Sequence, residues 1–174
     1  MKIAIIGYSG SGKSTLTEKL SHYYSIPKLH MDTLQFQPGW QDSDRDWMLN
    51  EMKNFLTKHE SWVIDGNYSW CYYEERMREA DQIIFLNFSP WTCLFRAFKR
   101  YLTYRGKVRE SMAAGCPERF DLEFIRWILW DGRTKNAKER YQKICSDYAD
   151  KVTIITNQKE LDCFLYYKFL KSID

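Results

Sequence analysis

A glycine-rich segment near the start of the chain limits the possible folds more than any other feature of the sequence. Residues 3–6 (IAII) are apolar and strand-forming, and residues 7–14 (GYSGSGKS) fit G-x-x-x-x-G-K-[ST] at every fixed position. This spacing predicts a strand, a tight loop and a helix that begins at about residue 12. In such a loop the backbone N–H groups surround a phosphate, and the positive end of the helix faces the same anion.

The residue types in this loop indicate how a nucleoside triphosphate would be held. Lys13 is expected to reach the β- and γ-phosphates, and Ser14 to offer its hydroxyl to Mg²⁺. The residues expected to contact the nucleotide are Gly7, Ser9, Gly10, Ser11, Gly12, Lys13, Ser14 and Thr15. The alternative is a glycine-rich turn without a ligand, but the strand pattern before the loop and the helical pattern after it favour a phosphate site.

The rest of the chain alternates strand patterns with helical patterns. Further strands are predicted at residues 28–30, 62–64, 82–87 and 152–156, and helices at about 43–59, 69–79, 89–104, 121–148 (with a bend at 131–132) and 160–170. Residues 33–41 and 106–117 are expected to be loops. The alternation predicts a three-layer α/β fold with a five-stranded parallel sheet. A chain of 174 residues is expected to form one domain.

Charge and cysteine content exclude little by themselves. The net charge of +3 indicates no particular partner, but the basic residues between 96 and 109 have no acid among them, which fits contact with an anion. Arg96 and Arg100 share one face of the predicted helix 89–104. The five cysteines form no C-x-x-C pair and indicate reduced thiols in a cytoplasmic protein. The first apolar run is too short for a signal sequence or a membrane span, so no membrane association is expected.

Two carboxylates follow predicted strands at the edge of the sheet where ligands bind in open α/β folds. Asp32 follows strand 28–30 and is expected to contact the substrate; the alternative is a helix N-cap or a turn residue. Asp65 follows strand 62–64 and is expected to hold a water of the Mg²⁺ shell near Ser14; the alternative is an Asx-turn, since Gly66 follows it. Asp81 precedes a strand, which places it at the opposite edge.

Several segments together resemble one family. The segments GYSGSGKST, LHMDTLQFQPGW, WVIDGNY, ADQIIFLNF, CLFRAFKRYLTYRGKVR, GCPERFD and WILWDGRTK are similar to those of the bacterial DNA topology modulation (FlaR-related) proteins. These proteins lie within the adenylate-kinase-like P-loop kinases, and the similarity extends over about residues 1–165. The resemblance implies a nucleotide-kinase-like fold with an acceptor-binding segment at about 33–60 and an arginine-bearing helical lid at about 105–133.

The resemblance also implies roles for single residues. Asp32 matches the acidic substrate contact of small-molecule kinases, and Asp65 matches the carboxylate that ends the third strand. Arg105, Arg109 and Arg133 would lie in or beside the lid, and Asn157 would lie in the loop that binds adenine. Adenylate kinases continue from the strand-ending Asp-Gly with Phe-Pro-Arg, whereas residues 67–69 here are Asn-Tyr-Ser, so AMP is not the expected acceptor.

Two functions are consistent with these features. The first is ATP- and Mg²⁺-dependent phosphoryl transfer to a small acceptor, with Lys13, Asp32 and the lid arginines Arg105, Arg109 and Arg133 as catalytic groups. The second is a nucleotide-dependent regulator that influences DNA topology without turnover. An acceptor site predicts that Asp32, Phe36 and Trp40 face the P-loop. ATP is preferred because no N-K-x-D motif is present, and direct DNA binding is not expected because no helix-turn-helix or zinc-finger pattern occurs.

Overall fold

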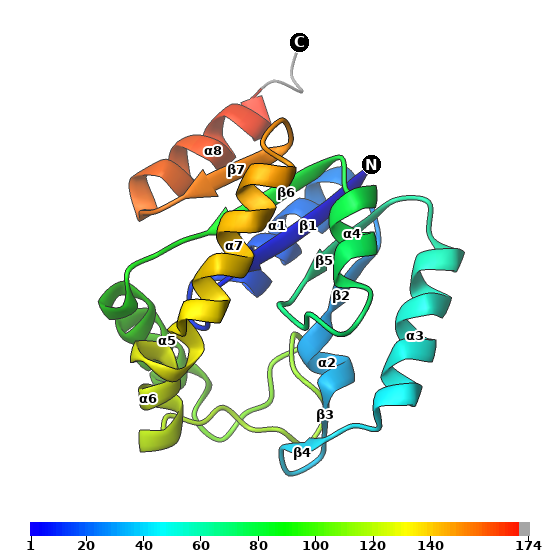
Figure 1. Ribbon diagram of the computed structural model, residues 1–174. Helices are drawn as coiled ribbons and strands as arrows, with labels where there is room; N and C mark the ends of the chain where they lie inside the picture. The colour runs from blue at the N-terminus through cyan, green and yellow to red at the C-terminus, as the bar shows by residue number, and fades with distance from the viewer. Residues whose placement is uncertain (171–174) are drawn as a thin grey trace.

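Five parallel strands form the central sheet of the computed structural model, which describes residues 1–170 (Figure 1). They are β1 (Lys2–Gly7), β2 (Lys28–His30), β5 (Trp62–Asp65), β6 (Gln82–Leu86) and β7 (Val152–Ile155), in the order β2-β5-β1-β6-β7. β1, β5 and β6 are buried over nearly their whole length, as is usual for parallel strands covered on both faces. The predicted five-stranded parallel sheet is therefore confirmed.

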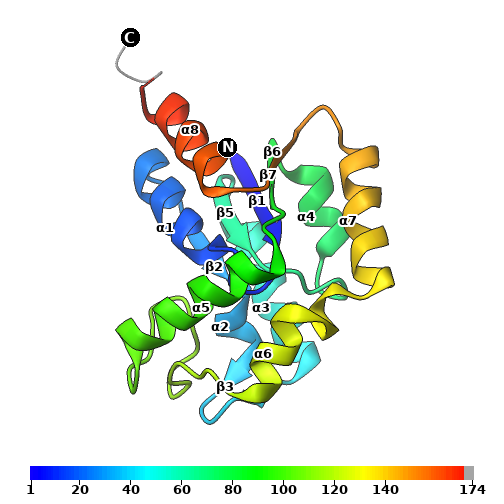
Figure 2. The same cartoon turned by 90° about the vertical axis from the view of Figure 1, so that its left-hand side faces the viewer.

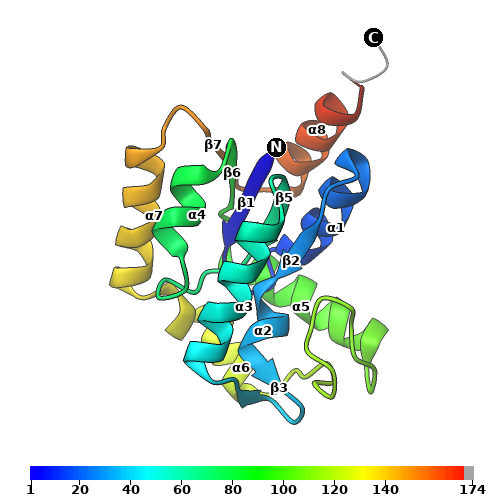
Figure 3. The same cartoon turned by 90° about the vertical axis from the view of Figure 1, so that its right-hand side faces the viewer.

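Helices cover both faces of the sheet. α1 (Lys13–Tyr24) and α8 (Gln158–Leu170) lie on one face, and α4 (Tyr73–Glu79) and α7 (Lys135–Asp147) lie on the other (Figure 2). α3 (Arg45–Lys58) lies beside the β2 edge (Figure 3). Leu16 and Leu20 of α1 are buried in the core, and on the other face Tyr141 of α7 stacks on Phe85 with the ring centroids 4.4 Å apart.

The remaining elements gather at the carboxyl-terminal end of the strands (Figure 1). They are α2 (Met31–Gln35), the hairpin of β3 (Phe36–Gln37) and β4 (Gln41–Asp42), α5 (Pro90–Tyr104), α6 (Leu122–Leu129) and the 3₁₀ turn η1 (Asp131–Arg133). Ser89 caps α5 by accepting a hydrogen bond from the N–H of Thr92, and Pro90 is its first residue, as predicted. At the opposite edge, Asp81 accepts a hydrogen bond from the N–H of Lys2 at 2.7 Å, so it does lie away from the loop after β1.

The hairpin contacts the segment 106–119, which follows α5. The Gly39 N–H donates to the Gly115 carbonyl at 3.0 Å, and Trp40 Nε1 donates to the Pro117 carbonyl at 3.2 Å. A small apolar cluster joins the same two segments and consists of Met112, Ala113 and Cys116 packed against Phe36 and Trp40. Residues far apart in the chain therefore hold each other at this end of the molecule.

Three predicted elements differ from the structure. Residues 33–41 are not a simple loop, because α2 extends to Gln35 and the hairpin turns at Gly39 and Trp40, whose φ angles are +80° and +65°. The predicted helix 121–148 is divided into α6, η1 and α7, because Thr134 caps a new helix by accepting from the N–H of Ala137. The predicted helix 69–79 begins only at Tyr73, after Tyr72 at a φ of +48°.

Two further observations concern the cysteines and the length of the helices. All five cysteines are free thiols, and Cys71, Cys93 and Cys116 are buried. Within residues 1–170, no helix combines the length and the apolar character that a membrane span needs.

Candidate active site

The loop between β1 and α1 has the backbone conformation of a phosphate-binding loop. Gly10 and Gly12 have φ angles of +79° and +97°, a region that favours glycine. A Cβ at position 10 would lie 2.5 Å from the carbonyl oxygen of Cys93, so Gly10 also permits close approach to α5. No side chain among residues 1–170 caps the start of α1 at Gly12, which leaves its first N–H groups available to an anion.

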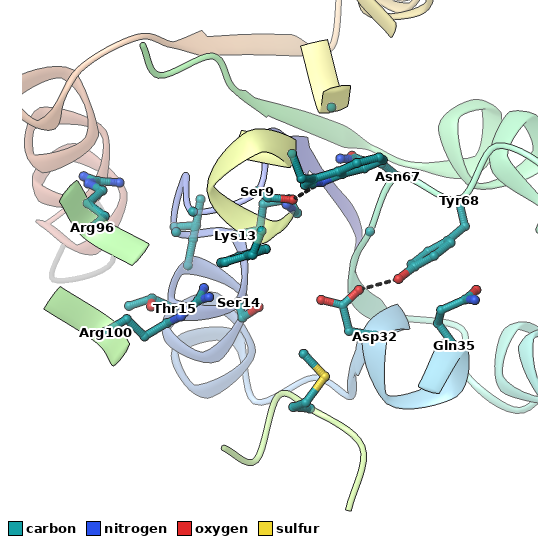
Figure 4. A pocket seen from close by; sticks show the side chains of 18 of the residues that line it. Ser9, Lys13, Ser14, Thr15, Asp32, Gln35, Asn67, Tyr68, Arg96 and Arg100 are labelled. Carbon is teal, nitrogen blue, oxygen red and sulfur yellow. Dashed lines mark hydrogen bonds between the residues drawn. The ribbon is translucent and has the colours of Figure 1, made fainter. Parts of the chain in front are cut away.

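A cavity of about 900 Å³ is lined by this loop, α2, the hairpin, α5, the segment 106–119 and α6. Side chains reach it from two sides of the loop and α1 (Figure 4). Arg96 and Arg100 lie on one side, and Asp32, Gln35 and Tyr68 lie on the other.

The cavity separates the predicted site residues into two groups. Those that line it are Ser9, Gly10, Gly12, Lys13, Ser14, Thr15, Asp32 and Arg109. Those outside its lining are Gly7, Ser11, Asp65, Arg105, Arg133 and Asn157. Phe36 and Trp40 belong to the first group, so the aromatic hairpin and the P-loop face one space.

Lys13 folds back over the loop that contains it. Its Nζ donates to the carbonyl oxygens of Gly7 at 3.0 Å and Tyr8 at 3.2 Å. Burial lowers the pKa of Lys13, and the charges of Asp32 and Asp65 oppose that shift. A phosphate would give Lys13 stronger, charge-assisted hydrogen bonds than these neutral carbonyls do.

Asp32 is the second residue of α2 and faces the cavity. Its Oδ1 accepts a hydrogen bond from the Tyr68 hydroxyl at 2.6 Å. Within residues 1–170, no side chain caps the start of α2, so Asp32 is not its N-cap. Burial, followed by the charge of Asp32, raises the pKa of Tyr68 well above its usual range. The phenol therefore stays protonated and keeps one carboxylate oxygen oriented.

Asp65 ends β5 behind the cavity and pairs with His30. The Asp65 Oδ2 lies 2.5 Å from His30 Nδ1, and His30 Nε2 lies 2.9 Å from Glu18 Oε1. Burial alone would lower the pKa of His30, but the hydrogen bonds and charges of Asp65 and Glu18 raise it. The Asp65 side chain thus bonds to the His30 ring, and its contact with a metal shell stays a prediction.

Arg96 connects three elements beside the loop. Its Nη1 donates to the Ser11 carbonyl at 2.5 Å, its Nη2 donates to Gln158 Oε1, and its guanidinium lies 4.0 Å from the centroid of the Phe88 ring. α5 is thereby attached to the P-loop and to the start of α8. Arg96 and Arg100 are two of the five arginines in the cavity lining among residues 1–170, and their i, i+4 spacing in the sequence was the signal that they share a helix face.

A buried carboxylate orients two arginines at the cavity. Glu118, whose side chain is only 4% exposed, accepts from Arg100 Nη2 and from Arg109 Nε, each at 2.6 Å. Arg109 Nη1 also donates to Ser111 Oγ at 2.9 Å. Such fixed guanidinium groups are suited to binding an anion through paired hydrogen bonds.

Arg105 and Arg133 do not belong to the lining of this cavity. Arg105 is exposed at the C-terminal end of α5. Arg133 donates to the carbonyl oxygens of Ile128 and Phe88, each at 3.0 Å, and its guanidinium lies 3.7 Å from the centroid of the Tyr8 ring. In this structure Arg133 connects η1 to the outer side of the P-loop.

Asn157 is exposed and takes part in the turn before α8. Its Oδ1 accepts from the N–H of Glu160 at 3.0 Å, which is a helix-capping contact. The next residue, Gln158, does line the cavity. The turn before α8 therefore contacts the cavity through residue 158 and not through residue 157, which the resemblance implies.

Asn67 is a site residue that the sequence did not identify. Its Oδ1 accepts from the Gly7 N–H at 3.2 Å, and its Nδ2 donates to the Gly7 carbonyl at 2.5 Å. The side-chain amide thus satisfies both backbone groups of the residue that begins the P-loop. The available signal was its position two residues after the end of a strand, which is too common to indicate a role.

Comparisons with known proteins show the fold. The chain matches no family model and no curated protein. Deoxyadenosine kinase from M. mycoides, solved with the products dCMP and a flexible dCDP bound, is 18% identical with a TM-score of 0.54 over 100% of both chains. Shikimate kinase from Bacteroides thetaiotaomicron is 18% identical with a TM-score of 0.51, over 96% of this chain and 95% of that one.

A gluconokinase from Sinorhizobium meliloti is 18% identical with a TM-score of 0.47, over 98% of this chain and 97% of that one. The first two similarities establish that the chain has the fold of the P-loop kinases, with a central parallel sheet between helical layers. The finer resemblance to the DNA topology modulation proteins stays a prediction.

Proposed function

We propose that this protein transfers the γ-phosphoryl group of ATP, with Mg²⁺, to a small acceptor bound between the P-loop and the hairpin. The observation that carries this proposal is that Asp32, Phe36 and Trp40 line the same cavity as Lys13. A nucleotide switch needs no second binding space opposite its phosphate loop, whereas a phosphotransferase does. We assign the acceptor-binding segment to residues 33–60 and the lid to residues 105–133.

The donor side would work by positioning and by stabilising charge, as phosphoryl transfer generally requires. The P-loop N–H groups and Lys13 would hold the β- and γ-phosphates. Arg100 and Arg109, oriented by Glu118, would neutralise charge that develops on the transferred group. Because Arg133 is bound to backbone carbonyls, we assign it a supporting rather than a direct part.

The residues present fit a magnesium ion. Mg²⁺ in phosphoryl-transfer sites takes one or two protein oxygens and fills its remaining positions with water and phosphate. Ser14 lines the cavity beside Lys13 and would supply its hydroxyl. Asp65 lies buried behind the cavity with one oxygen on His30, and it would act on the ion only through a bound water. When bound, the ion would neutralise charge on the β- and γ-phosphates.

Asp32 would act on the acceptor. It would accept the proton of the acceptor hydroxyl while that oxygen forms a bond to the γ-phosphorus. The bond between the γ-phosphorus and the β–γ bridging oxygen breaks, and ADP leaves with the electron pair. Tyr68 holds the carboxylate in place through its hydrogen bond to Oδ1.

The Lys13→Ala variant tests this proposal. ADP release in a coupled assay, with nucleosides, nucleotides and sugars as acceptors, should fall by about 100-fold or more, because Lys13 is the cation at the transferred phosphate. The exposed residue Lys53 on α3 supplies the control, and Lys53→Ala should leave the rate unchanged. An undiminished rate in Lys13→Ala would exclude the proposed mechanism.

A further inference from the structure

The cavity extends beyond the P-loop into a space between α4 and α7. We define the α4–α7 branch as the part of the cavity that is lined by Trp70, Tyr73, Ala137, Arg140 and Tyr141. These two helices cover the face of the sheet opposite to α1, whose start would hold the phosphates of ATP (Figure 2). The branch is therefore a part of the cavity to which the proposed phosphoryl transfer gives no role.

Arg140 is a half-buried cation of the branch that has no partner. Its guanidinium makes no hydrogen bond, ion pair or ring contact with any of residues 1–170. Lys135 and Lys143 of the same helix, in contrast, each pair with a carboxylate one turn away. Because Arg140 also lines the cavity, its N–H donors are available to a ligand there.

The Tyr141 hydroxyl is a second donor of the branch. It forms no hydrogen bond within residues 1–170, and burial, followed by the nearby Tyr73, raises the pKa of Tyr141 well above its usual range. The phenol therefore stays protonated and can donate. The charge of Arg140 acts on both phenols, which places these three groups near one another. The Tyr73 hydroxyl is fully enclosed, so we assign it no contact with a ligand.

A further arginine, Arg76, adds positive charge from behind the branch. It is only 1% exposed, and its guanidinium lies 5.4 Å from the centroid of the Tyr73 ring. Its hydrogen bonds to the carbonyl oxygens of Gly66 and Tyr68 are long, at 3.4 and 3.5 Å, and its Nε has no partner among residues 1–170. Burial lowers the pKa of Arg76 to about 10, so it stays charged at neutral pH. A buried cation so weakly compensated is costly unless an anion lies nearby.

No carboxylate offsets these charges inside the branch. Within residues 1–170, the acidic side chains that line the whole cavity are Asp32, Glu118, Glu123 and Asp131, and none of them belongs to α4 or α7. Asp65, whose charge acts on Arg76, is already bonded to His30. A cleft with low-dielectric walls strengthens the field of uncompensated charges, so this space favours an anion.

We propose that the α4–α7 branch binds an oxyanion, a phosphate or a carboxylate group, that is separate from the phosphates at the P-loop. Arg140 would hold it through paired N–H donors, the Tyr141 hydroxyl would donate a further hydrogen bond, and Arg76 would stabilise its charge through space. The oxyanion is either carried by the acceptor, since residues 68–70 connect the partner of Asp32 to the branch, or a free ion.

Binding of inorganic phosphate tests the site apart from turnover. Protein whose P-loop is saturated with a non-hydrolysable ATP analogue and Mg²⁺ is dialysed to equilibrium against radiolabelled phosphate. Arg140→Met should weaken phosphate binding about tenfold or more, and Tyr141→Phe about threefold or more. Lys138→Met removes a charge from the exposed side of the same helix and should change the affinity less than about twofold.

Three results would overturn the proposal. They are the absence of phosphate binding to the unmodified protein at millimolar concentration, an unchanged affinity in Arg140→Met, and an equal loss in Lys138→Met. The affinity of Arg140→Met for the ATP analogue, which also reports a folded protein, should stay within about twofold of the unmodified value. A tenfold loss there would assign Arg140 to the nucleotide phosphates and would likewise overturn the separate site.

Pairs of molecules that differ by one phosphate identify the source of the oxyanion. Calorimetry with the ATP analogue and Mg²⁺ present compares adenosine, cytidine and glucose with adenosine 5′-monophosphate, cytidine 5′-monophosphate and glucose 6-phosphate. If the acceptor carries the oxyanion, one phosphorylated molecule should bind about tenfold more tightly than its parent, and Arg140→Met should remove the difference. If a free ion fills the branch, inorganic phosphate should bind while the pairs show no difference. A preference that persists in Arg140→Met would overturn the assignment of that phosphate to the branch.

This inference and the proposed function fail in different ways. If phosphate binds with the predicted dependence on Arg140 but no ADP is released with any acceptor, the phosphotransferase is wrong and the oxyanion site stands. If ADP is released and Arg140→Met leaves phosphate binding unchanged, the oxyanion site is wrong and phosphoryl transfer stands.

Discussion

His30, the last residue of β2, is a buried polar side chain that joins two carboxylates. Its side chain is only 4% exposed, and both ring nitrogens face carboxylates, Asp65 at 2.5 Å and Glu18 at 2.9 Å. Asp65 itself is 2% exposed, so His30 is the hydrogen-bonding partner of a buried carboxyl group, and the two neighbouring carboxylates raise the pKa of His30. Removing one partner of a buried ion pair costs far more than the net value of the pair, because the other charge is left without compensation.

His30→Ala should therefore destabilise the protein. We expect the free energy of unfolding to fall by about 2–4 kcal/mol, because the Asp65 carboxylate stays buried without a partner. Urea denaturation at neutral pH measures this change. His22, an exposed histidine on α1, gives the matched control, and His22→Ala should change stability by less than about 0.5 kcal/mol. Similar values for the two variants would show that the His30 pair does not stabilise the fold.

Tyr68→Phe should affect turnover rather than nucleotide binding. The variant keeps the ring but loses the hydroxyl that donates to Asp32 at 2.6 Å. We expect kcat to fall about tenfold, because the carboxylate loses the contact that orients it, while the KM for ATP stays the same. Steady-state kinetics check both values, with Tyr166→Phe as a control because Tyr166 is 62% exposed on α8. A changed KM for ATP with an unchanged kcat would contradict this role.

The hairpin and the segment 106–119 behave as one structural unit in this fold. They share backbone hydrogen bonds and a small apolar cluster that is separate from the main core. The hairpin carries Phe36 and Trp40, and the segment carries Arg109 and Glu118, all of which line the cavity. Contacts between these elements therefore couple the acceptor side of the cavity to the arginines that would face the phosphates.

Gly115→Ala should loosen the hairpin without unfolding the molecule. The φ angle of Gly115 is +75°, and an added Cβ would lie 2.7 Å from Pro38 Cβ, so the two elements would have to separate. Amide hydrogens of residues 36–42, including the Gly39 N–H bonded to Gly115, should exchange about tenfold faster, as expected for local opening.

Gly106→Ala is a control for backbone strain in this experiment. Gly106 has a similar φ of +72°, but a Cβ there would have nothing within 4 Å among residues 1–170. Its substitution should introduce the same local strain and leave hydrogen exchange in the hairpin unchanged. Faster exchange of the hairpin in both variants would show that strain in the segment, rather than contact with Pro38, controls the hairpin.

Across the whole molecule, features with a local physical cause were predictable. The glycine and lysine spacing of the P-loop depends on backbone geometry within eight residues, and the strands follow from buried apolar runs such as Ile3–Ile6. The position of Asp32 at the cavity follows from the rule that ligands bind at the carboxyl ends of parallel strands. These inferences need no knowledge of distant contacts.

Features that depend on distant contacts were not predictable. The two hydrogen bonds of Asn67 to Gly7 join residues 60 positions apart, and Arg133 reaches carbonyls on α6 and near α5 instead of the cavity. The His30–Asp65 pair likewise forms only because β2 and β5 are neighbours in the sheet. Sequence patterns report the chemistry of a side chain, whereas its partner is decided by the packing of whole elements.

Nucleotide binding should stabilise the entire fold, because the cavity is bounded by elements from residue 9 to residue 165. A ligand that binds only the folded state at 100 times its Kd adds about 2.7 kcal/mol, which raises the Tm of a chain of this size by roughly 5–10 °C. We expect this shift when a non-hydrolysable ATP analogue and Mg²⁺ are added, and thermal denaturation measures it. Chelating the Mg²⁺ should reduce the shift, and Lys13→Ala should remove most of it. If millimolar analogue left the Tm of the unmodified protein unchanged, the P-loop of this chain would not be a nucleotide site.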